Sequence, residues 1–250
     1  MTLRIRSFFV AAAALPLALT LAACGNKTSD AAPSGEPAAK VAPPSGKAWT
    51  DVVAKTEEGG YRMGNPDAPI KLVEYGALSC SHCGEFAKES SEKLLNEYVA
   101  SGRVSYELRY FMLNAFDVPA SLLATCGAPE AVIPLSEQFW AWQPTLFSNL
   151  QSVGDAKLQQ AAALPPAQRM QALAQLGGMT EFFAARGISR DQGAACLADT
   201  AKADALAKQT ETASSKYQVT GTPTFFINGA SVGTSDWATL EPKLQAAGAR

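Results

Sequence analysis

The stretch Ser79-Cys80-Ser81-His82-Cys83-Gly84 decides the fold, because it places two cysteines where a strand is expected to end and a helix to begin. The apolar run Ile70–Tyr75 predicts a buried strand before it, and large side chains at helical spacing in Glu85–Val99 predict a helix after it. Cys80 then lies at the mouth of this helix, where unpaired backbone N–H groups and the positive end of the helix dipole stabilise a thiolate. Since the thiolate is the reactive form of cysteine, the arrangement predicts a redox-active dithiol.

The same Cys-x-x-Cys spacing also occurs as one half of a zinc site. A structural zinc ion needs four ligands, usually from a second cysteine pair or from two histidines. This chain has no second Cys-x-x-Cys, and its one histidine is His82, inside the motif. We therefore expect redox chemistry with no metal and no cofactor. We also expect the partial positive charge of His82 to lower the pKa of Cys80, the alternative being a surface imidazole without a role.

The composition is that of an ordinary globular protein. The 250 residues are 47% hydrophobic and 18% charged, which fits one domain or one elaborated domain. The net charge of −2 shows no basic excess, which argues against a nucleic-acid partner.

Residues 1–23 have the pattern of an export signal, because two arginines precede an uncharged run rich in Ala and Leu. The end of this run, Leu21-Ala22-Ala23-Cys24, resembles the lipobox of bacterial lipoproteins, which implies cleavage before Cys24 and a lipid on its sulfur. The alternatives are an ordinary signal peptide with an incidental cysteine and a membrane-spanning anchor, although a proline interrupts the run. Residues 24–48 contain no aromatic residue and almost no large aliphatic one, so we expect a flexible linker that holds the domain off a membrane.

The folded part begins near Trp49. Residues 49–114 contain the motif and a second apolar strand, Val104–Leu113, and the order strand–helix–strand implies a parallel pair with a crossover helix. Residues 115–200 are rich in Ala, Gln and Leu, are broken by prolines and glycines, and show no fixed repeat, which predicts an inserted cap of several short helices. Its aromatic residues are expected mainly to pack the cap, while one or two line a groove beside the motif: Phe139, Trp140, Trp142 and Phe147.

Residues 201–250 return to alternating helix and strand. A helical pattern ends at Tyr217, and the strand Thr224–Ile227 is followed by Asn228-Gly229, a strong hairpin-turn signal. A last helix follows, with Ser235 or Asp236 as its expected cap.

This order of elements, over residues 49–248, resembles the thioredoxin fold with the helical insertion of the DsbA family. The expected fold class is therefore α/β, thioredoxin-like with an inserted helical domain. In that family a glutamate six residues before the first cysteine is buried under the disulfide, and Glu74 has this position. Thr222-Pro223 resemble the pair at the family's cis-proline, which flanks the active site.

Physical chemistry gives these two matches roles. Burying a carboxylate costs free energy, so a buried Glu74 is expected to have a chemical role, namely to accept the proton of Cys83. The alternative is a side chain turned to solvent. A cis Pro223 would expose backbone groups beside Cys80 that pair with an extended substrate, the alternative being an ordinary trans turn.

The two remaining cysteines, Cys126 and Cys196, lie in the insertion and belong to no Cys-x-x-Cys. In an exported protein we expect them to form a structural disulfide, because unpaired thiols do not last there. The alternative is two buried free thiols that behave as small hydrophobic side chains.

The resemblance implies an exported thiol:disulfide oxidoreductase that oxidises dithiols of unfolded or partly folded exported proteins. It implies a monomer on the periplasmic side of a bacterial membrane, lipid-anchored or else free in the periplasm, and reoxidised by a quinone-linked membrane oxidase. The chain departs from the family's pattern at two places. Ser81-His82 replaces the Pro-His of the best-known oxidants, and a threonine before the cis-proline, the position of Thr222, is also common in disulfide isomerases. A reductase or isomerase therefore stays an alternative, as does a non-catalytic lipoprotein that binds peptides.

Overall fold

The computed structural model describes residues 36–250. The predicted signal peptide, residues 1–23, and the expected lipidation site Cys24 lie outside these residues. Within the described residues, no helix is both long enough and apolar enough to cross a membrane.

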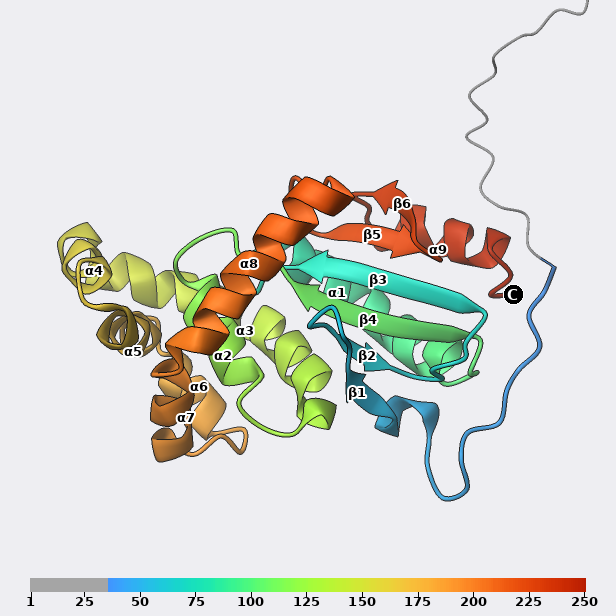
Figure 1. The fold of residues 1–250 in the computed structure, drawn as a ribbon, viewed down its shortest axis with the longest axis horizontal. Coiled ribbons are helices and arrows are strands. Elements are labelled where there is room, and N and C mark those ends of the chain that lie inside the picture. Colours follow the sequence, from blue (N-terminus) through green and yellow to red (C-terminus); the bar gives the residue numbers. More distant parts are fainter. Residues whose placement is uncertain (1–35) are drawn as a thin grey trace, which may run out of the picture. The chain divides into compact units, whose positions relative to one another are not determined.

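A six-stranded mixed sheet forms the centre of the described chain, in the order β1-β2-β4-β3-β5-β6 (Figure 1). The central strands β3 and β4 are parallel, with Ile70 opposite Val104, and all other neighbours pair antiparallel. The predicted parallel pair and the hairpin at Asn228-Gly229 are therefore confirmed. The strands are β1 (Val53–Lys55), β2 (Tyr61–Met63), β3 (Ile70–Gly76), β4 (Val104–Tyr110), β5 (Thr224–Ile227) and β6 (Ala230–Gly233).

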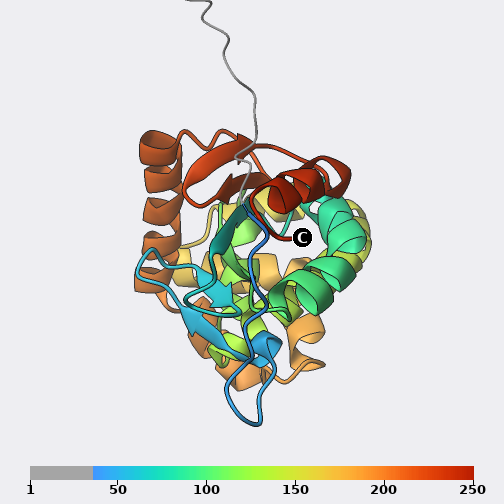
Figure 2. The same ribbon diagram turned by 90° about the vertical axis from the view of Figure 1, so that its right-hand side faces the viewer.

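Helices cover the two faces of this sheet. Figure 2 shows α8 (Thr200–Tyr217) on one side, and α1 (Ser81–Lys93) and α9 (Trp237–Ala246) on the other. The chain after α1 continues as a π-helix, Leu94–Val99. Because successive side chains of a strand point to opposite faces, β3 supplies both layers: Leu72 packs in the large core cluster with α1, and Tyr75 packs with Tyr217 of α8.

Six helices of the described chain lie between β4 and α8 and form the insertion (Figure 1). An aromatic cluster holds it together, because the ring of Phe139 contacts those of Trp142, Phe182 and Phe183 with centroids 5.3–5.6 Å apart. The α/β fold class with a helical insertion is thus confirmed. The helices are α2 (Asp117–Ala124), α3 (Val132–Val153), α4 (Asp155–Ala162), α5 (Pro166–Leu176), α6 (Met179–Ala184) and α7 (Arg190–Leu197), with short 3-10 turns at Trp49–Asp51 and Pro129–Ala131.

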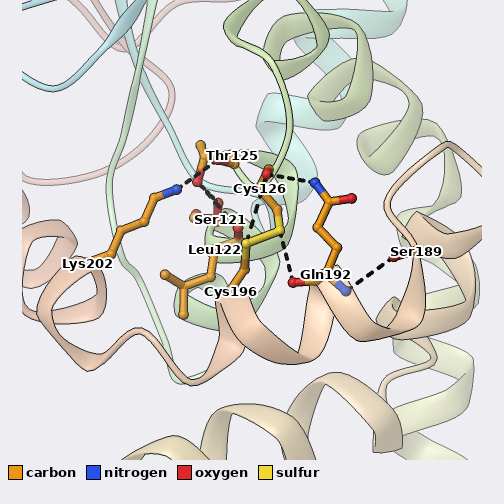
Figure 3. The surroundings of a disulfide bond; sticks show 8 residues. All are labelled: Ser121, Leu122, Thr125, Cys126, Ser189, Gln192, Cys196 and Lys202. Atoms are coloured by element: carbon orange, nitrogen blue, oxygen red, sulfur yellow. Dashed lines mark hydrogen bonds between the residues drawn. A yellow bond between two sulfur atoms is a disulfide. The ribbon is translucent and has the colours of Figure 1, made fainter.

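A disulfide ties the insertion together (Figure 3). It joins Cys126, just after α2, to Cys196 in α7, with the two Cα atoms 5.9 Å apart. Hydrogen bonds surround it: Gln192 Nε2 donates to the carbonyl oxygen of Cys126 at 3.1 Å, and Lys202 Nζ donates to that of Thr125 at 2.7 Å (Figure 3). The structure therefore contains the pairing that the sequence analysis expects.

The expectation of a flexible linker over residues 24–48 is wrong for its second half, where the chain is hydrogen-bonded to the folded domain. The backbone N–H of Ala38 donates to the carbonyl oxygen of Gly248 at 2.9 Å, and that of Val41 donates to Ser101 at 3.0 Å. The indole of Trp49 then donates to the carbonyl oxygen of Val41 at 2.7 Å. Backbone hydrogen bonds hold the chain on the domain from Ala38 onward, so a segment with few apolar side chains is ordered without a core of its own.

We predict that replacing both insertion cysteines, in Cys126→Ser/Cys196→Ser, lowers the free energy of unfolding by about 2–4 kcal/mol, because the bridge restricts a long loop of the unfolded chain. Urea denaturation without reductant measures the change. Wild type in which only Cys80 and Cys83 are reduced serves as the control. A variant that unfolds at the wild-type urea concentration would show that the bridge has no structural role.

Candidate active site

The two motif cysteines differ in access to solvent. Cys80 is the N-cap residue of α1, and Cys83 lies in the first turn of this helix. Cys80 is 8% exposed and Cys83 is 0% exposed, and both are free thiols. A molecule that approaches from solvent therefore meets the sulfur of Cys80 first.

The surroundings of Cys80 favour its thiolate. Its pKa is lowered to about 6, first by a hydrogen bond from the thiol of Cys83 and then by the side chain of Thr222 and by the backbone N–H groups of Cys83 and His82. Burial acts in the opposite direction but is outweighed. The two backbone donors are the unpaired N–H groups at the start of the helix, as the sequence position of Cys80 predicts. At neutral pH Cys80 is therefore mostly ionised.

The surroundings of Cys83 favour its neutral thiol. Burial raises the pKa of Cys83 well above its usual range, and the hydrogen bond to Cys80 and the charges of Glu74 and Cys80 raise it further. The two thiols of one short motif thus have opposite proton affinities. One is ready to leave or to attack, and the other stays protonated until a base accepts its proton.

The expected electrostatic role of the His82 side chain is not what the structure shows. The imidazole is 76% exposed, and its Nδ1 lies 3.0 Å from Glu85 Oε2. His82 acts on the pKa of Cys80 through its backbone N–H. Among residues 36–250, no group of three or more Cys, His, Asp or Glu side chains is placed to hold a metal ion.

Glu74 lies on β3 and is completely buried, so it does not turn to solvent. Its Oε2 accepts a hydrogen bond from the Tyr106 hydroxyl at 2.7 Å, and its Oε1 has no partner. Burial raises the pKa of Glu74 to about 8, while the Tyr106 hydrogen bond lowers it and the charges of Cys80 and Glu137 raise it. A carboxyl with this pKa exchanges a proton close to neutral pH, as a base for Cys83 must do.

The loop before β5 brings Thr222 to the dithiol. The Thr222–Pro223 peptide bond is cis, and the thiol of Cys80 donates to the carbonyl oxygen of Thr222 at 3.2 Å. The Thr222 hydroxyl is buried without a partner and is able to donate to the Cys80 thiolate. The structure therefore joins the two motifs that the sequence analysis singled out.

Asp117, which the sequence analysis missed, fixes the residue before Cys80. It is 0% exposed, its Oδ1 accepts from the Ser79 N–H at 2.8 Å, and its Oδ2 accepts from the Ser79 hydroxyl at 2.9 Å. The backbone N–H groups of Leu113 and Asn114 also donate to Oδ2. The sequence signal for this role is a lone aspartate between apolar residues at a helix start.

Helix α3 holds the same loop from the other side, and this contact was also missed. The indole of Trp140 donates to the carbonyl oxygen of Ala77 at 2.9 Å, and Gln143 Nε2 donates to that of Leu78 at 2.8 Å. The insertion therefore positions the chain that leads into Cys80, and Trp140 does more than pack the cap.

The fold and the site define a thioredoxin-fold dithiol protein with a helical insertion. A family model described as thioredoxin matches residues 56–246, so the chain belongs to the thioredoxin family. It is similar to a crystal structure described as a protein-disulfide isomerase from Novosphingobium aromaticivorans, with 34% identity, a TM-score of 0.72, and coverage of 75% of this chain and 96% of that one.

Two more distant proteins are also similar, the first of them in its fold. Wolbachia pipientis alpha-DsbA1 is 21% identical with a TM-score of 0.59, over 75% of this chain and 90% of that one. A protein from Rickettsia bellii named "Putative protein-disulfide oxidoreductase" is 24% identical over 178 residues, which are 71% of this chain and 60% of that protein. The chain thus spans roughly three fifths of the length of the curated relatives that it matches first.

We predict that the Cys80 thiolate titrates with a midpoint near pH 6. Below this pH the thiol is protonated, so its alkylation rate falls about tenfold per pH unit, whereas Cys83 stays unreactive. Ultraviolet thiolate absorbance and iodoacetamide labelling measure both. In Cys83→Ala the midpoint moves to higher pH, because the hydrogen bond that lowers the pKa most is lost. Equal labelling of both cysteines with an ordinary midpoint would contradict this assignment.

We predict that Tyr106→Phe raises the pKa of Glu74 further above its present value of about 8, because the carboxylate loses its hydrogen-bond donor. The rate at which Cys83 attacks a mixed disulfide on Cys80 rises with pH as Glu74 loses its proton, so in Tyr106→Phe this rise occurs at higher pH. In Glu74→Gln the rise disappears and the step is slower, because no carboxylate accepts the proton of Cys83.

Tyr110→Phe is the matched control for this test. Tyr110 is also a buried tyrosine of β4, but its hydroxyl pairs with Ser136 at 2.5 Å. It should keep the wild-type pH profile. A profile that shifts equally in both tyrosine variants would mean that Tyr106 acts only through packing.

Proposed function

We propose that this chain is an exported thiol:disulfide oxidoreductase that oxidises the dithiols of secreted proteins through a Cys80–Cys83 disulfide. The observation that carries the proposal is the opposite proton affinity of the two thiols, with the pKa of Cys80 lowered to about 6 and that of Cys83 raised. A stabilised Cys80 thiolate makes the reduced protein favourable, so the oxidised protein is a strong oxidant.

The first step forms a mixed disulfide. A substrate thiolate attacks Sγ of Cys80, the Cys80–Cys83 bond breaks, and the electron pair leaves on Cys83. Cys83 is buried and its pKa is raised, so it takes up a proton. Glu74 is mostly protonated at neutral pH because its pKa is about 8, and it supplies that proton.

The second step releases the product. A second substrate thiolate attacks the substrate sulfur of the mixed disulfide, a substrate disulfide forms, and the electron pair leaves on Cys80. The substrate has lost two electrons and the protein has gained them as a dithiol. Cys80 is a good leaving group because its thiolate is stabilised by Cys83 and by the helix start.

The backbone beside Thr222 is the proposed contact for the substrate chain. Its carbonyl oxygen accepts a hydrogen bond from the thiol of Cys80 at 3.2 Å, which places an edge of backbone next to the reacting sulfur. An extended polypeptide adds to such an edge through main-chain hydrogen bonds, without a requirement for one sequence. This suits unfolded or partly folded exported proteins as substrates.

Export to the periplasm is proposed from the leader pattern of residues 1–23 and is supported by the Cys126–Cys196 disulfide, since structural disulfides persist in oxidising compartments. We further propose a lipid on Cys24, a monomeric protein, and reoxidation by a quinone-linked membrane oxidase.

A disulfide isomerase is the second candidate. It is favoured by the 34% identity to the Novosphingobium aromaticivorans protein described as a protein-disulfide isomerase, and by Thr222 before the proline. An isomerase works with Cys80 reduced and rearranges wrong disulfides, whereas an oxidase works from the disulfide form.

We predict that the Cys80–Cys83 couple is more oxidising than about −200 mV, because thiolate stabilisation favours the reduced form. Equilibration with glutathione buffers measures the potential, and oxidation of dithiothreitol by the oxidised protein measures the activity. A potential near that of thioredoxin, about −270 mV, would reject the oxidase. Faster recovery of a scrambled substrate than of a reduced one would favour the isomerase. If the protein shows no thiol–disulfide exchange in either assay, it is a non-catalytic peptide-binding protein.

We predict that metabolic labelling with a fatty acid marks the protein and that Cys24→Ser abolishes the label, because the sulfur of this residue is the expected acceptor. Membrane fractionation of both forms measures the consequence. A Cys24→Ser protein that is still processed and membrane-bound would indicate an ordinary signal peptide or a spanning anchor.

A further inference from the structure

A groove runs between α1 and α3 beside the dithiol, with a volume of about 1050 Å³. Ser81 and Gly84, which follow Cys80 in the first turns of α1, line one end of it. Phe147 also lines the groove and is 42% exposed. Together with Trp140, Ala141 and Pro144, Phe147 gives the α3 side of the groove an apolar lining, as binding sites usually have.

The two helices give this groove a direction. Gly84 lies against Trp140 and Gln143 of α3, whereas Ser91, two turns further along α1, is hydrogen-bonded to Glu137, which comes earlier in α3. The helices therefore run antiparallel along the groove. Phe147 consequently lies toward the Cys80 end, and Glu92 and Glu137 lie toward the other end.

The charges of the groove are mainly negative. Three carboxylates line it, those of Glu85, Glu92 and Glu137, against one cation, Lys88. Glu85 already pairs with the imidazole of His82 near the Cys80 end. Glu137 is partly buried, burial raises its pKa, and it is hydrogen-bonded to Ser91, so the exposed Glu92 carries most of the negative charge available to a bound molecule, at the end away from Cys80.

We propose that this groove binds the stretch of a substrate polypeptide that flanks its reacting cysteine, with a large apolar side chain against Phe147 and a lysine or arginine beside Glu92 and Glu137. The inference rests on the proposed function and names its substrate class. The apolar end suits the hydrophobic residues that unfolded chains expose, and the acidic end complements a basic side chain.

The length of the groove sets the spacing. Glu92 comes twelve positions after Cys80 in the sequence, which at a helical rise of about 1.5 Å per residue is roughly 18 Å along α1. An extended polypeptide advances about 3.3 Å per residue, so this length holds about five residues. The basic residue is therefore expected about five positions from the substrate cysteine, with the apolar residue next to that cysteine.

The test uses two dithiol peptides that differ at one position. Both carry phenylalanine beside the first cysteine, and one carries lysine and the other glutamate about five positions away. We expect the full-length oxidised protein to oxidise the lysine peptide with a kcat/KM about two- to fivefold higher, a preference that falls as salt is added. Peptides with serine in place of cysteine, followed by fluorescence polarisation, should show the same order of affinity without any redox step.

Three variants locate the effect. Glu92→Gln should reduce the preference for lysine, while Glu89→Gln, on the same helix but outside the groove, should keep it. Phe147→Ala should lower the affinity for both peptides by the same factor. Dithiothreitol is too small to fill the groove, so its oxidation measures the dithiol chemistry alone and should not change in Glu89→Gln.

The two kinds of failure are distinguishable. Equal kcat/KM and equal affinity for the two peptides, or a lysine preference that is undiminished in Glu92→Gln, would overturn the groove proposal while dithiothreitol oxidation continues. Wild type that fails to oxidise dithiothreitol would overturn the proposed function instead, and the serine peptides would still decide whether the groove binds.

Discussion

The stabilisation of one thiolate at the start of α1 is the interaction on which the site depends. The lowered pKa of Cys80 comes from hydrogen-bond donors, which are the thiol of Cys83, the Thr222 side chain and two backbone N–H groups. These donors converge because Cys80 is the N-cap residue of a helix that follows a buried strand. A helix start has unpaired N–H groups in any protein, and the Cys-x-x-Cys spacing adds the Cys83 thiol, which contributes most to the lowered pKa.

A second constraint is the buried carboxyl under this thiolate. Burial of Glu74 is unfavourable for its charged form, and only one of its two oxygens has a hydrogen-bond partner. The sheet holds it there, because β3 is paired on both sides by β4 and β5 and cannot turn the side chain outward. The result is a carboxyl whose proton affinity lies close to neutrality, next to a thiol that must gain and lose a proton in each cycle.

The helical insertion is part of the active site in two ways. Asp117 of α2, together with Trp140 and Gln143 of α3, binds the loop that leads from β3 to Cys80 and so fixes the position of the sulfur. The same α3 forms the second wall of the groove along α1. The disulfide and the aromatic cluster around Phe139 hold the insertion together, so the geometry of the dithiol depends on packing well outside the thioredoxin sheet.

The sequence by itself determined the elements whose signal is local. A Cys-x-x-Cys between an apolar run and a helical pattern was enough for the dithiol and the parallel pair, and Asn228-Gly229 was enough for the hairpin. The tertiary structure alone decided which distant groups meet: Thr222 and Cys80 are 142 positions apart, and Tyr106 and Glu74 are 32 apart. Such hydrogen bonds leave no periodicity in the sequence. Strands of three residues, as in β1 and β2, are likewise too short to show alternation, and a chain held by its backbone, as at Ala38, has no side-chain pattern to read.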